Sequence, residues 1–423
     1  MSDSRTDAAA ATAPDAANRV ASAVAAAPFV RVFGHADGDA LAACGLLAVA
    51  LRDREIPFRV HVSADPVGDA VAAETAEDNS SGAGEPDADA ESQSLVVSRG
   101  QRGPADLTVP ARGDRQPASV AAAAISRELG VDPDPVLALA GIIAAGETPG
   151  GAGSDDLLAA AESAGLVERR PGVAVPTADI ATDLAHSTRL DAPFSGAVDA
   201  ASDLLADLGS QSDSDAELDE GIRTQLASAV AVATATADTA APQAADSVEP
   251  VLRPYATPTA PFATLGGYAD VVSALAREAP GVAVSLAFGA PGAVSEAVGV
   301  WREHAAAAHA ALDSPTTGRY DGVFVLRVET DRPAVLPTVA RLARAYRSPE
   351  PVALVATDDP VDGRRQAALA ATEPRGLDDA TATVAREFDG DAGGTPTQAT
   401  LTVAGSVADG ELIAAVREAL DDD

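Results

Sequence analysis

Several residue types are scarce or missing in this 423-residue sequence. It has one cysteine, Cys44, and no lysine, and aromatic residues make up 3% of it. A single cysteine excludes a disulfide scaffold and a metal cluster held by several thiolates. No apolar run reaches the roughly 18–20 residues that cross a bilayer, and no charged segment followed by an apolar one opens the chain. We therefore expect a soluble, cytoplasmic protein with no membrane partner.

The charge is strongly one-sided. The chain has 29 basic residues, all arginine, against 64 acidic ones, which gives a formal net charge of −35. Such acidity ordinarily argues against a nucleic-acid partner, because phosphate binding relies on basic residues. In molar salt, however, the Debye length is only about 3 Å, so a large negative charge causes little self-repulsion. We interpret the composition as adaptation to molar salt, with a generic acidic protein as the alternative, and charge alone does not decide about nucleic acid.

The hydrophobic pattern predicts an α/β fold with two α/β domains. Residues 29–33 and 58–62 alternate like strands and flank a helical segment at 40–54, a βαβ opening that implies a parallel sheet. In the second half, residues 320–328 and 351–356 are strand-like and 334–346 helical. Residues 282–288 are also expected to form a strand.

Composition sets the predicted boundaries. We expect a disordered acidic, alanine-rich tail at 1–27 and a first domain at 28–208 with a disordered acidic insertion at 74–93. A hinge with a linking helix is expected at 209–245, and a second α/β domain at 246–423.

One turn carries a clear chemical pattern. His35, Asp37 and Asp39 lie in GHADGDA (residues 34–40, the motif-one turn), between a predicted strand and a predicted helix. Ligands of open parallel sheets bind at the carboxyl ends of strands. An imidazole and two carboxylates at this spacing can converge on a divalent cation such as Mn²⁺ or Mg²⁺. The alternative is that Asp37 or Asp39 only caps the following helix.

A second polar segment is His186, Ser187, Thr188 and Arg189. Hydroxyl and guanidinium groups often contact phosphates, so we regard these four as substrate-phosphate candidates. The alternative is a helix end that packs against Phe194.

The strand, the GHADGDA turn and the helix together resemble the first motif of the DHH phosphoesterases, the family of RecJ-like nucleases. The resemblance, of a haloarchaeal type, continues through residues 118–121, 135–141, 184–189 and 192–196. From about Pro254 onward the chain is similar to the DHH-associated domain. The resemblance implies an N-terminal parallel-sheet DHH-like domain, a C-terminal DHH-associated-like domain and a divalent-metal phosphodiesterase site.

The sequence departs from the family pattern where metal ligands are expected. It contains no Asp-His-His triplet, and in the corresponding stretch, 110–115, only Asp114 offers a carboxylate. Residues 142–145 are apolar, and the glycine loop at 393–396 lacks its histidine. A two-metal site stabilises both the attacking and the leaving oxygen and draws on many ligands. Three residues would hold at most one ion, weakly, which describes a vestigial or partial site.

We therefore expect a catalytically degenerate RecJ-like protein of DNA replication or repair. It would bind single-stranded DNA or RNA, or act as a scaffold for GINS and the replicative helicase, as the inactive RecJ relative of the eukaryotic replisome does. The first alternative is an active Mn²⁺-dependent single-strand exonuclease or phosphoesterase, with Asp114 completing the metal site. The second is an unrelated α/β protein whose turn only caps a helix.

Overall fold

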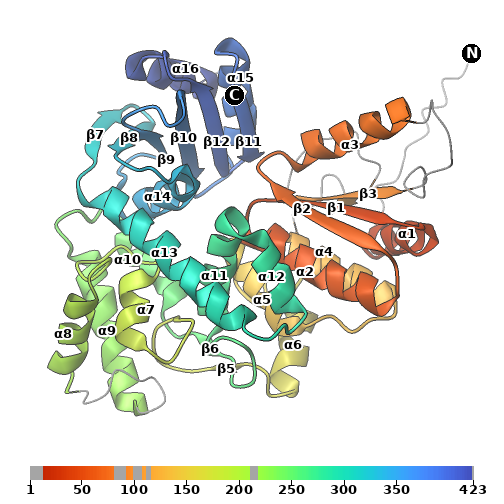
Figure 1. The fold of residues 1–423 in the computed structure, drawn as a ribbon. Coiled ribbons are helices and arrows are strands. Elements are labelled where there is room, and N and C mark those ends of the chain that lie inside the picture. Colours follow the sequence, from red (N-terminus) through yellow and green to blue (C-terminus); the bar gives the residue numbers. More distant parts are fainter. Residues whose placement is uncertain (1–12, 81–91, 99–106, 111–115, 210–217, 422–423) are drawn as a thin grey trace, which may run out of the picture.

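The computed structural model describes residues 13–80, 92–98, 107–110, 116–209 and 218–421. Two separate sheets organise this part of the chain (Figure 1). A parallel sheet has the order β2-β1-β3-β4, and a six-stranded sheet has the order β11-β12-β10-β9-β8-β7 with one parallel pair, β8–β9. The predicted α/β class is confirmed.

The strands of the first sheet are β1 (Val30–His35), β2 (Phe58–Ser63), β3 (Gln93–Val97) and β4 (Thr108–Val109). A short pair joins β5 (Glu168–Arg169) to β6 (Tyr255–Ala256). The second sheet comprises β7 (Thr316–Tyr320), β8 (Val323–Val328), β9 (Val352–Thr357), β10 (Arg364–Ala371), β11 (Asp391–Thr395) and β12 (Gln398–Ala404).

Helices cover both faces of the parallel sheet. Val30 and Val32 of β1 point into a core shared with α1, α2 and α4, whereas Phe33 packs under α3 on the opposite face. This alternation is the expected result of a strand whose successive side chains point to opposite faces. The helices of this region are α1 (Ala13–Ala26), α2 (Gly38–Asp53), α3 (Pro66–Ser80), α4 (Ala118–Glu128), α5 (Pro135–Ala144) and α6 (Asp155–Ser163).

The predicted disorder near the N-terminus is wrong in two places. Residues 13–26 form α1, whose buried positions Ala17, Val20, Ala21 and Val24 follow helical spacing and join the core. Residues 74–80 of the expected insertion belong to α3. Residues 1–12 and 81–91 lie outside the described residues.

The middle of the chain is helical. It contains α7 (Ile180–His186), α8 (Val198–Asp207), the expected linking helix α9 (Glu220–Ala235), α10 (Ala244–Val248), α11 (Leu265–Glu278), α12 (Pro280–Ala287) and α13 (Ala293–Asp313). Helices α11 and α12 pack on α2, and residues from Phe262 to Trp301 share the core of the parallel sheet. The boundaries drawn at 208 and 245 stay predictions. No helix in the described ranges is long and apolar enough to cross a membrane.

Residues 282–288, expected as a strand, form most of α12. Pro280 takes the first helical position, where its missing N–H is not needed, and the apolar run that follows is helical. Short apolar runs do not distinguish a buried strand from a buried helix, which explains the error.

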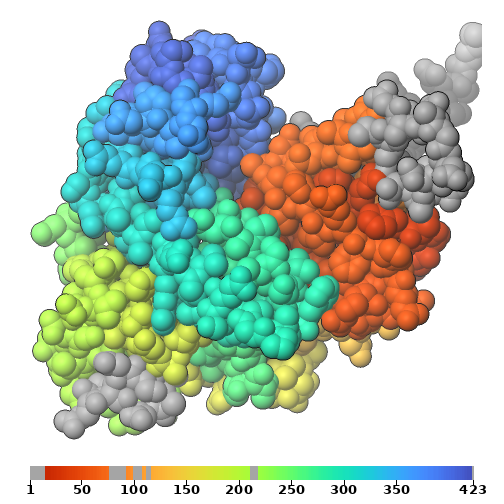
Figure 2. Space-filling model, viewed as in Figure 1, coloured from red at the N-terminus to blue at the C-terminus, as the bar shows by residue number. Residues whose placement is uncertain are grey.

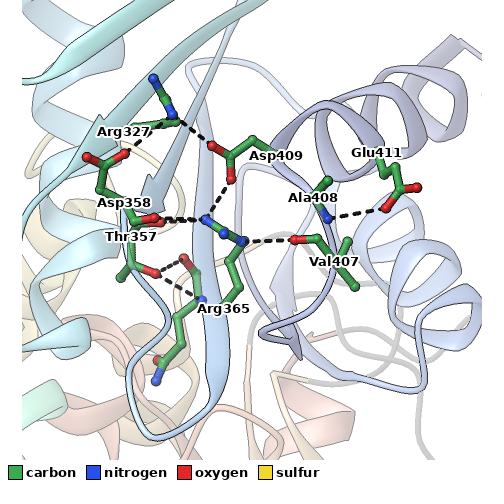
Figure 3. A network of polar contacts seen from close by, with 9 residues as sticks. Arg327, Thr357, Asp358, Arg365, Val407, Ala408, Asp409 and Glu411 are labelled. Atoms are coloured by element: carbon green, nitrogen blue, oxygen red, sulfur yellow. Dashed lines mark hydrogen bonds and ion pairs between the residues drawn. The ribbon is translucent and has the colours of Figure 1, made fainter.

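The second sheet has helices on both faces. Helices α15 (Leu377–Glu387) and α16 (Asp409–Asp421) cover one face, and α14 (Leu336–Leu342) packs against β9 and β10 on the other. The predicted helix at 334–346 is confirmed as α14 with its two flanking turns. Buried Arg365 donates to the carbonyl of Thr357 and pairs with Asp409 at 2.7 Å (Figure 3). Asp409 also accepts from Arg327, so this network ties the start of α16 to the sheet.

Candidate functional site

The motif-one turn lies at the carboxyl end of the central strand β1. His35 is in register with Ser63 of β2, and the Ala36 N–H donates to the Ser63 carbonyl at 2.8 Å. A Cβ on Gly393 of β11 would lie 2.3 Å from the carbonyl oxygen of Ala64. The edge of the second sheet therefore meets the loop after β2, and Figure 2 shows the surface hollowed between these two parts.

His35 and Asp37 contact each other. His35 Nδ1 lies 2.7 Å from Asp37 Oδ2, while Asp37 Oδ1 accepts from the Ala40 N–H at 2.8 Å and caps α2. Burial alone would raise the pKa of Asp37, but the hydrogen bond and charge of His35, together with the Ala40 N–H, hold that pKa below its usual value. Asp37 is therefore the ionised partner of His35 and a helix cap at once.

Asp39 faces a different helix. Its carboxylate, only 3% exposed, accepts from the N–H groups of Ala118 (2.6 Å) and Ser119 (2.9 Å) and from the Ser119 hydroxyl (2.6 Å). Pro117 at the start of α4 has no side-chain acceptor to offer, so Asp39 caps that helix from 79 residues away. Burial raises the pKa of Asp39 to about 6, and the charge of Asp37 adds to the shift.

These contacts do not fit the divalent ion that the sequence resemblance implies. His35 and Asp37 bind each other, and both oxygens of Asp39 are taken by N–H and O–H donors. Within the described ranges, no group of three His, Cys, Asp or Glu side chains is arranged to hold a metal. Asp114 lies outside the described residues, so its role stays a prediction.

Helix α11 brings Arg277, which sequence reasoning missed, to the motif-one turn. A Cβ on Gly38 would lie 2.6 Å from Ser273 Oγ, so α11 touches the start of α2 there. Arg277 follows one helical turn later on the same face, and its charge and that of Asp37 stabilise each other. Burial lowers the pKa of Arg277 to about 10, Asp37 opposes that shift, and Arg341 adds to it. Among the described residues, none forms a hydrogen bond or ion pair with the Arg277 side chain.

Two more arginines, Arg341 and Arg189, interact by charge with Arg277 or with each other. Arg341 of α14 donates to the Thr188 carbonyl at 2.9 Å and to its hydroxyl at 3.2 Å. Burial lowers the pKa of Arg341, the nearby Asp270 opposes this shift, and Arg189 adds to it. Burial likewise lowers the pKa of Arg189, and Nε of Arg189 is buried without a hydrogen-bond partner in the described structure. Arg189, Arg277 and Arg341 are each half-buried, and none has a carboxylate within ion-pair distance in the described part of the chain.

The segment 186–189 is only partly available to a ligand. The hydroxyls of Ser187 and Thr188 donate to Asp270, and His186 donates through Nδ1 to the Thr182 carbonyl at 2.7 Å. The His186 ring lies 6.1 Å from that of Trp301. Arg189 is therefore the one member of this segment whose side chain keeps an unsatisfied donor among the described residues. The phosphate role of all four stays a prediction.

Sequence reasoning also missed a serine at the sheet edge. Ser98 directly follows β3, which pairs with β1, and its hydroxyl is buried without a partner in the described structure. Its position at a strand end was a usable signal. For Arg277 and Arg341 no local signal exists, because their approach depends on how α11 and α14 pack.

The chain is similar in sequence to a protein from Haloarcula marismortui. It is 43% identical over 396 residues to a protein described as "Uncharacterized protein rrnAC1427" from Haloarcula marismortui, which covers 93% of this chain and 94% of that protein. The family model "Uncharacterized protein rrnAC1427, C-terminal domain" matches residues 315–418.

Solved structures share the fold. CDC45 from Entamoeba histolytica matches with a TM-score of 0.59 at 8% identity, over 96% of this chain and 99% of that one. RecJ from Thermus thermophilus in complex with Mn²⁺ has a TM-score of 0.47 at 15% identity, over 97% of this chain and 54% of that one. The chain therefore shares the fold of CDC45, in agreement with the α/β class expected from the sequence. The chain belongs to the family of rrnAC1427.

Proposed function

We propose that this protein is a non-hydrolytic, RecJ-like protein of DNA replication or repair that binds single-stranded DNA or RNA. The observation that carries the proposal is the position of Asp39, which caps α4 instead of joining His35 and Asp37. Hydrolysis of a phosphodiester needs an activated water, and metal ligands or a general base must supply it. Asp37, with its lowered pKa, is a weak base at neutral pH.

The arginines support phosphate binding. Burying a guanidinium without a carboxylate at ion-pair distance is unfavourable, and a phosphate group would relieve that cost with charge-assisted hydrogen bonds. Arg189, Arg277 and Arg341 provide such groups in a chain whose overall charge is −35. We infer that a nucleic-acid strand places its phosphates against these three arginines. The sequence resemblance adds GINS and the replicative helicase as proposed protein partners.

A binding assay tests the nucleic-acid role. Fluorescence anisotropy of a labelled single-stranded DNA or RNA oligonucleotide would be measured in molar KCl with wild type, Arg189→Gln and Arg344→Gln. We expect Arg189→Gln to weaken binding about tenfold or more, because a charged hydrogen bond contributes about 1.5–3 kcal/mol. Arg344 contacts Pro351 and Thr372 elsewhere, so Arg344→Gln should bind like wild type. Equal affinity for all three proteins would contradict the proposal.

The alternative function is a Mn²⁺-dependent single-strand exonuclease or phosphoesterase. The close pair of His35 and Asp37 at a strand end favours it, because two ligands are already together there. Under this alternative Asp39 leaves α4 when an ion binds. Mn²⁺-dependent cleavage that disappears in the Asp37→Ala/Asp39→Ala double variant would establish it.

A further inference from the structure

We propose that the guanidinium of Arg277 takes the place of a divalent cation at the motif-one turn, so that arginine holds phosphates there without metal. The first half of this inference, the replacement of the cation by Arg277, concerns the protein alone. The second half, phosphate binding, rests on the proposed function.

The packing of α11 fixes Arg277 beside the turn. Gly38 allows close approach of α2 and α11, since a Cβ on it would lie 2.6 Å from Ser273 Oγ and 2.8 Å from the Ala144 Cβ. Ser273 itself donates to the Ala269 carbonyl at 2.7 Å, so this part of α11 is regular. Arg277 lies four residues beyond Ser273 and therefore on the same helical face. The charges of Arg277 and Asp37 stabilise each other across this helix contact.

The charges at the turn are already matched. Asp37 is paired with His35 and is stabilised by the charge of Arg277, and Asp39 is satisfied by the N-terminus of α4. A helix N-terminus carries partial positive charge that stabilises a carboxylate. A divalent ion that bound Asp37 would meet the positive charge of Arg277 there. To bind Asp39 as well, it would have to displace the three hydrogen bonds that Asp39 accepts from α4. Both effects oppose metal binding.

A guanidinium is well suited to hold a phosphate. It presents parallel N–H donors that match two phosphate oxygens, and it keeps its charge at any physiological pH. The charges of Arg277 and Arg341 repel each other, and a bound phosphate would offset that repulsion. The expected ligand is therefore a phosphodiester or a terminal phosphate of a nucleic-acid strand, bound equally with and without divalent ions.

Manganese binding tests the first half directly. Electron paramagnetic resonance of free Mn²⁺ would be recorded in molar KCl, which screens the surface carboxylates, with wild type and Asp37→Asn. Circular dichroism would show that both are folded. We expect the two proteins to remove the same amount of Mn²⁺ from solution. One equivalent bound by wild type and lost in Asp37→Asn would overturn the inference.

Oligonucleotide binding tests the second half. Anisotropy with a labelled single strand would be measured with EDTA and with Mn²⁺, for wild type, Arg277→Gln and Arg344→Gln. We expect equal affinities in EDTA and Mn²⁺, a loss of about tenfold or more for Arg277→Gln, and no change for Arg344→Gln. Binding that EDTA abolishes, or that Arg277→Gln leaves intact, would overturn the second half of the inference. A wild type that binds no strand would refute the proposed function, and the manganese measurement would still decide whether the motif-one turn binds a divalent ion.

Discussion

Asp37 and Asp39 are two residues apart, yet they cap different helices. Asp37 accepts one N–H from α2, whereas Asp39 accepts three hydrogen bonds from the start of α4 and is almost fully buried. Losing a single cap costs about 1 kcal/mol. Leaving several buried donors unpaired costs more.

We therefore expect Asp39→Ala to lower the free energy of unfolding by about 3 kcal/mol and Asp37→Ala by about 1 kcal/mol. Urea unfolding in molar KCl with EDTA measures both. If the two carboxylates instead formed a metal-ligand pair, removing either would relieve like-charge repulsion in the metal-free protein. Both variants would then be more stable than wild type, and the account of Asp39 would be refuted.

The sequence predicted part of this site. The strand, the turn and the capping role were all readable from residues 29–40, because they depend on neighbours in the chain. The partner of Asp39 was not readable, since Ala118 and Ser119 reach it only through the packing of α4 on α2. Arg277 was missed for the same reason.

At the scale of elements, the contact between α2 and α11 positions Arg277. We expect Gly38→Ala to destabilise the protein by about 1–3 kcal/mol, because the added methyl would overlap Ser273 Oγ and the Ala144 Cβ. Thermal unfolding measures the loss. Adding Ser273→Gly should restore part of it, since one of the two overlapping atoms is removed. Gly38→Ala as stable as wild type would show that the helices can separate freely.

A buried histidine links α13 to the segment before α8. His309 Nε2 lies 3.0 Å from the Ser187 carbonyl. Burial lowers the pKa of His309, although the hydrogen bond to Ser187 and the charges of Asp191 and Asp270 oppose the shift and His186 adds to it. The His309 imidazole therefore takes up a proton less readily in the folded state than in the unfolded chain.

It follows that the contribution of His309 to stability is present above pH 6.5 and is lost as the pH falls below this value. As the pH is lowered below 6.5, we expect the free energy of unfolding to fall more steeply for wild type than for His309→Asn. Urea titrations at several pH values compare the slopes. Identical slopes would mean that His309 titrates alike in both states.

Elements were predicted well where the pattern had one interpretation. Strand β1, helix α2 and strands β8 and β9 follow clear periodicity, and all are found. Helix α1 was missed because its alanine-rich, acidic sequence is typical of a tail, although Val20 and Val24 gave it a buried face. That face is stabilised by contact with α4, which composition does not reveal.

At the scale of the whole molecule, the net charge of −35 sets the salt dependence. At low ionic strength carboxylates repel one another over long distances, and molar salt reduces the screening length to about 3 Å. We expect the melting temperature to rise steadily from dilute buffer to molar KCl. Circular dichroism melts at several KCl concentrations measure it. A melting temperature independent of salt would contradict the interpretation of the acidity as adaptation to salt.

In the function proposed above, the protein holds a nucleic-acid strand without cutting it. The most direct test incubates end-labelled single-stranded DNA with the protein and Mn²⁺ in molar KCl, beside Asp37→Asn, and analyses each sample on native and denaturing gels. We expect a strand that is retarded on the native gel and intact on the denaturing gel with both proteins. Strands shortened by wild type and spared by Asp37→Asn would contradict it and establish a metal-dependent nuclease.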